Sequence, residues 1–97
     1  MIKTDIKSSL ITVNIVCPMW DEDKFKPVMK KLTPTLTVSK LRPMLTRMVK
    51  APKGREVEFT VRSAEDPLIL VPMDNPLRDL SFYSIRDGDF IEVKWAE

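Results

Sequence analysis

The side chains that support covalent or metal chemistry are scarce in this sequence. Cys17 is the only cysteine, and the chain contains no histidine. An intramolecular disulfide, a histidine-based catalytic triad and a histidine-containing zinc site are therefore all excluded. A cysteine at a strand end is usually a small apolar side chain rather than a nucleophile, and the sequence has no glycine-rich phosphate loop. We predict that the protein is not an enzyme and that it has no catalytic residue, metal site or cofactor.

A pair of carboxylates near the C-terminus, in Asp87-Gly88-Asp89, is the local pattern closest to a cation site. Calcium takes roughly six to eight oxygen ligands, and two carboxylates fall well short of that number. Glycine reaches positive φ without steric cost, so the same three residues are typical of a tight turn. The sequence therefore favours a tight turn over a calcium site at these three residues.

Positive charge is concentrated in the middle of the chain, although the net charge is only +2. The segment 56–97 contains ten acids and four bases, whereas the segment 24–55 contains no acid and ten bases, which are Lys24, Lys26, Lys30, Lys31, Lys40, Arg42, Arg47, Lys50, Lys53 and Arg55. On a helix, Lys40, Arg47 and Lys50 share one face, and Lys53 and Arg55 lie just beyond its end. These five residues form a candidate protein-binding surface that can steer an acidic partner toward the domain.

Two interpretations of this basic segment stay open. It is either an interaction surface or a solvated helix face beside an edge strand that lysines protect from pairing. No aromatic side chains alternate with the lysines, so we expect no nucleic-acid partner. The sequence also lacks a run of about 18 apolar residues, so we expect no membrane partner. Trp20, which lies among acids in a predicted loop, is a candidate exposed anchor for a protein partner.

Hydrophobic periodicity predicts one helix and several short strands. The helix spans Thr37 to Lys50, with Thr37 as its N-cap, Pro43 as a bend, and an apolar stripe of Val38, Leu41, Met44, Leu45, Met48 and Val49. Strands are predicted at residues 10–17, 25–32, 57–62, 68–73 and 91–95. Pro27 indicates that the second strand is an edge, and the first and last strands are apolar enough to pair side by side, in parallel, at the centre. Trp95 and the methionines are expected in the core.

The order of these elements indicates an α+β fold, a ubiquitin-like β-grasp with a mixed four- to five-stranded sheet and one α-helix packed across it. Residues 1–9 lack periodicity and are predicted to be a linker or tail, with residues 10–97 as the ubiquitin-like domain. Several stretches also resemble the C-terminal ubiquitin-like domains of the tubulin-folding cofactor E family: LITVNI at 10–15, LTRMVKAP at 45–52, GREVE at 54–58 and FYSIRDGD at 82–89.

The resemblance implies a protein-interaction module that contributes to assembly and dissociation of the tubulin heterodimer, with α-tubulin and tubulin-folding cofactor B as partners. It also implies a cytoplasmic, cytoskeleton-associated location, and we expect the isolated domain to be a monomer. The alternative is a generic ubiquitin-like docking domain that engages the proteasome or a ubiquitin-pathway receptor. Such domains bind receptors through an apolar patch on the open face of the sheet, where this chain places Glu92 and Lys94. Charges at these positions disfavour the alternative, because a receptor would have to desolvate them.

Overall fold

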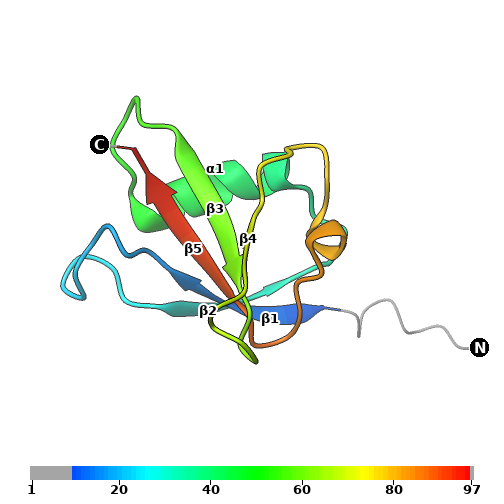
Figure 1. Cartoon of the computed structure of the whole chain (residues 1–97). Coiled ribbons are helices and arrows are strands. Elements are labelled where there is room, and N and C mark those ends of the chain that lie inside the picture. Colours follow the sequence, from blue (N-terminus) through cyan, green and yellow to red (C-terminus); the bar gives the residue numbers. More distant parts are fainter. Residues whose placement is uncertain (1–9, 97) are drawn as a thin grey trace, which may run out of the picture.

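The computed structural model describes residues 10–96, and the tail predicted at residues 1–9 lies outside the described residues. The strands are β1 (Ile11–Val16), β2 (Val28–Leu32), β3 (Val57–Arg62), β4 (Leu70–Pro72) and β5 (Phe90–Trp95). They are joined by the helix α1 (Val38–Val49) and by a 3₁₀ turn, η2 (Leu80–Tyr83). Each predicted strand and the predicted helix is therefore present, although the first, second and fourth strands are shorter than predicted (Figure 1).

The five strands form one mixed sheet in the order β2-β1-β5-β3-β4. β1 and β5 pair in parallel, with Ile15 opposite Ile91, and the other three pairings are antiparallel. The predicted central pairing of the first and last strands is confirmed, and β2 is at an edge as Pro27 indicated. Gly88, whose φ is +88°, lies in the turn that leads into β5, as the sequence predicted.

Helix α1 crosses one face of this sheet and closes the core (Figure 1). Its predicted stripe is correct: Val38, Leu41, Leu45 and Val49 are buried, and Met44 and Met48 are half-buried at the margin. Burying each large apolar side chain contributes roughly 1.5–3 kcal/mol before the entropy of ordering is subtracted. The helix continues through Pro43.

The N-terminus of α1 is held by a distant segment rather than by a side-chain cap. Thr37 occupies the N-cap position, but its hydroxyl contacts Ser39 and not a backbone N–H of the helix. The first free N–H groups, of Val38 and Ser39, donate instead to the carbonyls of Arg78 and Pro76 at 2.9 and 3.0 Å. Because unpaired donors at a helix start are costly, the segment before η2 fixes where α1 begins.

One expectation about the methionines needs correction. Met29 is 69% exposed, so the prediction that the methionines are core residues is wrong for it. Its register partner on β1 is Asn14, a residue of the open face of the sheet, which directs Met29 away from the helix.

Within residues 10–96, no helix is long and apolar enough to cross a membrane.

Candidate protein-interaction surface

The solvent-facing side of α1 carries the predicted cations. Lys40 and Arg47 are exposed and, at about 100° per residue, lie roughly 20° apart opposite the buried stripe, and the exposed Lys50 follows the last helical residue. Lys53 and Arg55 are exposed on the loop from α1 to β3. We call these five residues the basic surface: Lys40, Arg47, Lys50, Lys53 and Arg55.

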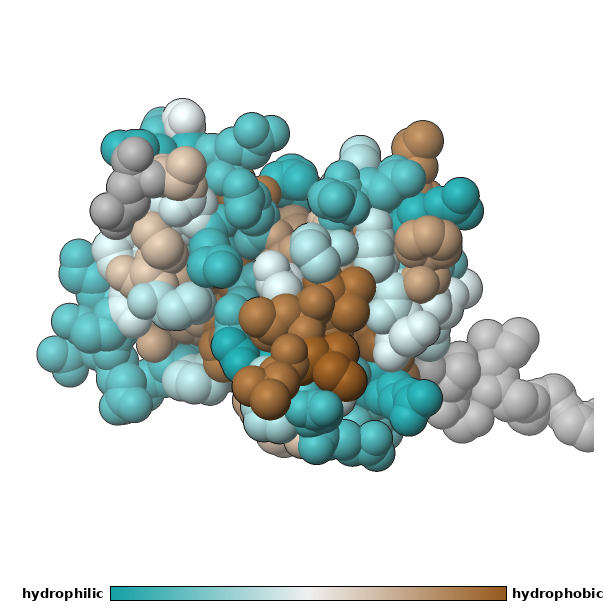
Figure 2. All heavy atoms as spheres, in the orientation of Figure 1, coloured by the Kyte–Doolittle hydropathy of each residue, from teal (hydrophilic) through white to brown (hydrophobic). Residues whose placement is uncertain are grey.

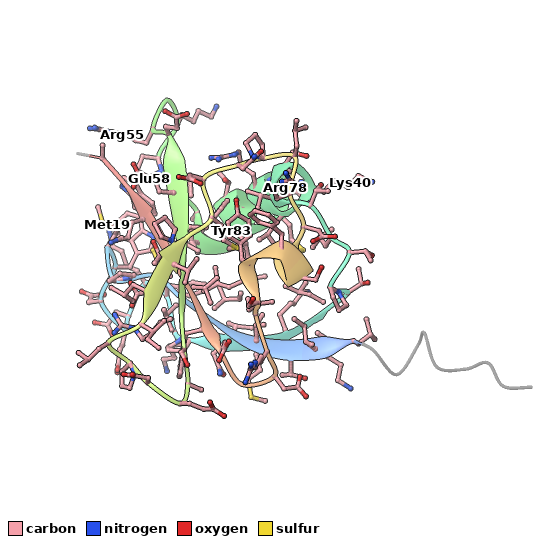
Figure 3. All side chains as sticks on the ribbon, turned by 45° about the vertical axis from the view of Figure 1, so that its right-hand side comes forward. Met19, Lys40, Arg55, Glu58, Arg78 and Tyr83 are labelled. Atoms are coloured by element: carbon pink, nitrogen blue, oxygen red, sulfur yellow. The ribbon has the colours of Figure 1, made fainter. Side chains whose placement is uncertain are left out.

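The basic surface is an elongated strip rather than a pocket. Lys40 and Arg55 lie at opposite ends of α1 (Figure 3), and a rise of about 1.5 Å per residue separates Lys40 from Lys50 by roughly 15 Å along the axis. The structure therefore brings Lys50, Lys53 and Arg55 to one end and leaves Lys40 apart from them. Such a strip suits an extended acidic surface better than a small anion.

A left-handed residue turns the chain at the end of the helix. Lys50 has φ 56° and ψ 50°, and the N–H groups of Lys50 and Ala51 donate to the carbonyls of Arg47 and Thr46 at 3.2 and 3.1 Å. This is the Schellman arrangement, in which glycine is the usual residue at the left-handed position. Arg55 is then fixed by a hydrogen bond from Nη1 to the carbonyl of Ala96 at 3.1 Å. Backbone geometry thus holds this end of the strip in place.

Trp20 packs against the same end of the helix. Its indole Nε1–H donates to the carbonyl of Val49 at 2.6 Å, and its ring meets Trp95 edge-on with 5.3 Å between centroids. The side chain is half-buried, so packing within the domain occupies much of the surface that an exposed anchor would offer. Its predicted role in protein binding stays a prediction.

One cation beside Trp20 was missed among the predicted site residues. Lys24 Nζ lies 4.6 Å from the centroid of the Trp20 ring, a cation–π distance, in a loop that also carries the exposed acids Asp21, Glu22 and Asp23. Spacing alone gives no signal for this, because the contact depends on how the loop between β1 and β2 folds back. Arg42, by contrast, is turned inward: it donates to the carbonyl of Val57 and lies over the Phe59 ring at 5.3 Å.

The open face of the sheet carries an ion pair at its centre. Arg62 on β3 donates through Nε to Glu92 Oε2 on β5 at 2.7 Å, and a second guanidinium nitrogen contacts the same oxygen. Glu92 is buried, whereas Lys94 and Glu58 are exposed. A receptor that needs an apolar face would have to desolvate this pair without replacing it, which argues against the ubiquitin-receptor alternative.

The carboxylates of the turn before β5 accept hydrogen bonds from the protein itself. Asp87 Oδ1 accepts the N–H of Thr12 at 2.6 Å. Asp89, which unlike Asp87 is buried, accepts the N–H groups of Ala64 and Arg86, each at 2.9 Å. Among the described residues, no group of three or more potential metal-ligating side chains comes together. The turn is therefore a structural element that connects β5 to β1 and β3.

The thiol of Cys17 is a buried core group. The residue is 6% exposed, and burial raises the pKa of the thiol, although hydrogen bonds from the backbone of Met19 and Trp20 partly oppose this. A raised pKa keeps the thiol protonated at neutral pH, where it is a poor nucleophile. This environment is what the sequence predicted for a cysteine at a strand end.

Comparison with known proteins gives relatives but no matching protein-family model. The chain is 36% identical over 91 residues to tubulin-specific chaperone E of Danio rerio, which covers 94% of this chain and 17% of that protein. The C-terminal ubiquitin-like domain of mouse tubulin-specific chaperone E superposes with a TM-score of 0.75 at 29% identity, covering 92% of this chain and 89% of the mouse domain. Tubulin-binding cofactor B of Trypanosoma brucei has the same fold, with a TM-score of 0.74 at 16% identity over 92% of this chain and 98% of that one.

Proposed function

Because the chain is homologous to tubulin-specific chaperone E and has the ubiquitin-like β-grasp fold of its C-terminal domain, we propose that it is a non-enzymatic protein-interaction module of a tubulin-folding cofactor. In this role it contributes to assembly and dissociation of the tubulin heterodimer through protein contacts, in the cytoplasm and in association with the cytoskeleton. The chain spans only about one sixth of the length of the relatives it matches.

The observation that carries this proposal is the basic surface on a helix whose other face is buried. Its cations are exposed, with Lys40 and Arg47 on α1 and Lys50, Lys53 and Arg55 beyond its last residue. A strip of one sign raises the rate at which an oppositely charged protein meets it and selects against partners of the same sign. The proposed partners are α-tubulin, which would meet the strip with an acidic surface, and tubulin-folding cofactor B.

The test is binding of the chain to purified α/β-tubulin at low and at physiological salt. We expect the triple variant K40E/R47E/K50E to weaken binding by at least about tenfold at low salt, and the difference to shrink as salt rises. The matched control is K30E/K31E/K94E, which makes the same change in net charge at exposed positions away from the basic surface. An equal loss of tubulin affinity in both variants would mean that only the total charge of the chain matters. Unchanged tubulin affinity in K40E/R47E/K50E would contradict the proposal.

A further inference from the structure

Three consecutive apolar side chains are exposed where the sequence predicted a strand. Leu68, Ile69 and Leu70 are 90%, 51% and 50% exposed, and the strand β4 begins only at Leu70. Figure 2 shows a continuous apolar area over β4 and the loop before it. Contiguous apolar areas of this kind on small domains are often functional.

The backbone holds these side chains outward in an ordered way. Leu70 is opposite Arg62 in the β3–β4 register, so it lies on the open face, while Val71 opposite Val61 faces inward. The turn before them is closed by Asp66, whose side chain accepts the N–H of Leu68 at 3.1 Å and whose carbonyl accepts that of Ile69 at 2.9 Å. An ordered apolar surface costs less entropy to bind than a mobile one.

Of these three residues, Ile69 lines a cavity of about 340 Å³ between β4 and the segment from η2 to β5, whereas Leu70 lies on the opposite, open face of β4. Its apolar walls include Val61, Ile69, Val71 and Tyr83. We call the exposed residues 68–70 together with this cavity the β4 groove. The volume of the cavity is at the low end of the range for ligand-binding pockets, about 300–1,000 Å³.

The charges around the β4 groove are mainly negative. Exposed carboxylates of Glu65 and Asp87 line the cavity and Asp66 lies in the adjoining turn, against one exposed base in the lining, Arg86. Arg62, the other cation nearby, is paired with Glu92. A partner that places apolar side chains here therefore gains from basic residues on either side of them.

We propose that the β4 groove binds a short segment of a protein partner in which bulky apolar side chains are flanked by arginine or lysine. This site has the opposite charge preference from the basic surface and does not depend on the proposed role in tubulin folding. The domain would then contact two partners, or two parts of one partner, through separate surfaces.

The probe is a pair of synthetic peptides with the same three consecutive leucines, flanked by arginines in one and by glutamates in the other. Each is titrated into the isotopically labelled chain and followed by amide NMR shifts. We expect the arginine peptide to shift amides of residues 63–71 and 84–87, and the glutamate peptide to bind more weakly. The variant L68S/L70S should weaken binding by about tenfold, and E65K should weaken binding of the arginine peptide.

The matched control is L77S, because Leu77 is 83% exposed but lies outside the β4 groove. We expect this variant to bind the arginine peptide as tightly as the wild type does. Amide spectra of each variant report whether the fold is kept. Absence of shifts in the groove with the arginine peptide, equal binding of both peptides, or unchanged binding by L68S/L70S would overturn the proposal. Self-association of the chain that L68S/L70S abolishes, measured by sedimentation, would overturn it in favour of a second copy as the occupant.

Discussion

The indole N–H of Trp20 is 2.6 Å from the carbonyl oxygen of Val49, so the loop after β1 is joined to the last turn of α1. The bond satisfies one of the carbonyls that a helix end leaves without an intrahelical partner. It also holds the loop that carries Lys24, whose ammonium lies over the Trp20 ring, against the end of α1. Folding and the shape of the basic surface therefore depend on the same side chain.

Replacing Trp20 by Phe keeps an aromatic ring but removes the donor. We expect the free energy of unfolding to fall by about 1–2 kcal/mol, because the Val49 carbonyl loses its partner. Urea denaturation measures this, with K24A as the control that removes only the cation over the ring and should cost less than about 1 kcal/mol. A variant W20F of unchanged stability but weaker tubulin binding would assign Trp20 to the interface instead.

The hydroxyl of Tyr83 accepts the backbone N–H of Asn75 at 2.9 Å and lies 3.4 Å from its carbonyl. Y83F leaves that N–H without its acceptor, and we expect a loss of roughly 1–3 kcal/mol in the free energy of unfolding. L77A is the control on the same connection, because Leu77 is 83% exposed and its replacement should change stability by no more than about 0.5 kcal/mol. If Y83F and L77A have equal effects, the hydroxyl does not anchor this segment.

Asp79 caps η2 and gives the domain a pH dependence at low pH. Its side chain accepts hydrogen bonds from the hydroxyl of Ser81 and the N–H of Phe82, and these lower its pKa from the ordinary value of 3.8. Because the pKa is lower in the folded state, the contribution of Asp79 is fully present above pH 3.8 and is lost as pH falls through the lowered value.

The measurement is the urea midpoint of the wild type and D79A as a function of pH. The wild type should be more stable than D79A above about pH 5, and the gap should close in strong acid. The control is D74A, which alters an exposed carboxylate on the same connection. A gap between wild type and D79A that does not change with pH would exclude the carboxylate as the cause.

Lys50 occupies a left-handed conformation that glycine adopts more readily. We expect K50G to raise the free energy of unfolding by about 0.5–1 kcal/mol, because relief of strain at this position exceeds the entropy that glycine adds to the unfolded chain. K53G, at a residue without positive φ, should be neutral or destabilising. Since K50G also removes a cation, tubulin binding should weaken while stability rises, which separates the two roles of this residue.

The sequence alone predicts the parts of the fold that periodicity controls. Alternation in β1 and β5 and the stripe of α1 follow from which side chains must leave water, and the proline before β2 indicates an edge strand because it has no N–H to donate. The cations of the basic surface are exposed for the same reason. Their use in binding stays a prediction, since exposure does not identify a partner.

Contacts between distant segments account for what the sequence did not reveal. The N-terminus of α1 is satisfied by carbonyls of Pro76 and Arg78, which no local capping pattern indicates. Trp20 packs onto the helix although acids surround it in the sequence, and the Leu68–Leu70 run is exposed although its composition suggests a core strand. In each case tertiary geometry overrides a local preference.

The parallel pairing of Asn14 with Phe90 has a consequence for biosynthesis. The centre of the sheet joins the first and last strands of this domain, so its core cannot be completed until β5 has been synthesised. At roughly 5–20 residues per second, several seconds pass between the two events. During that interval β1 lacks its parallel neighbour and the apolar stripe of α1 lacks the central strand of its sheet, and exposed surfaces of this kind favour aggregation.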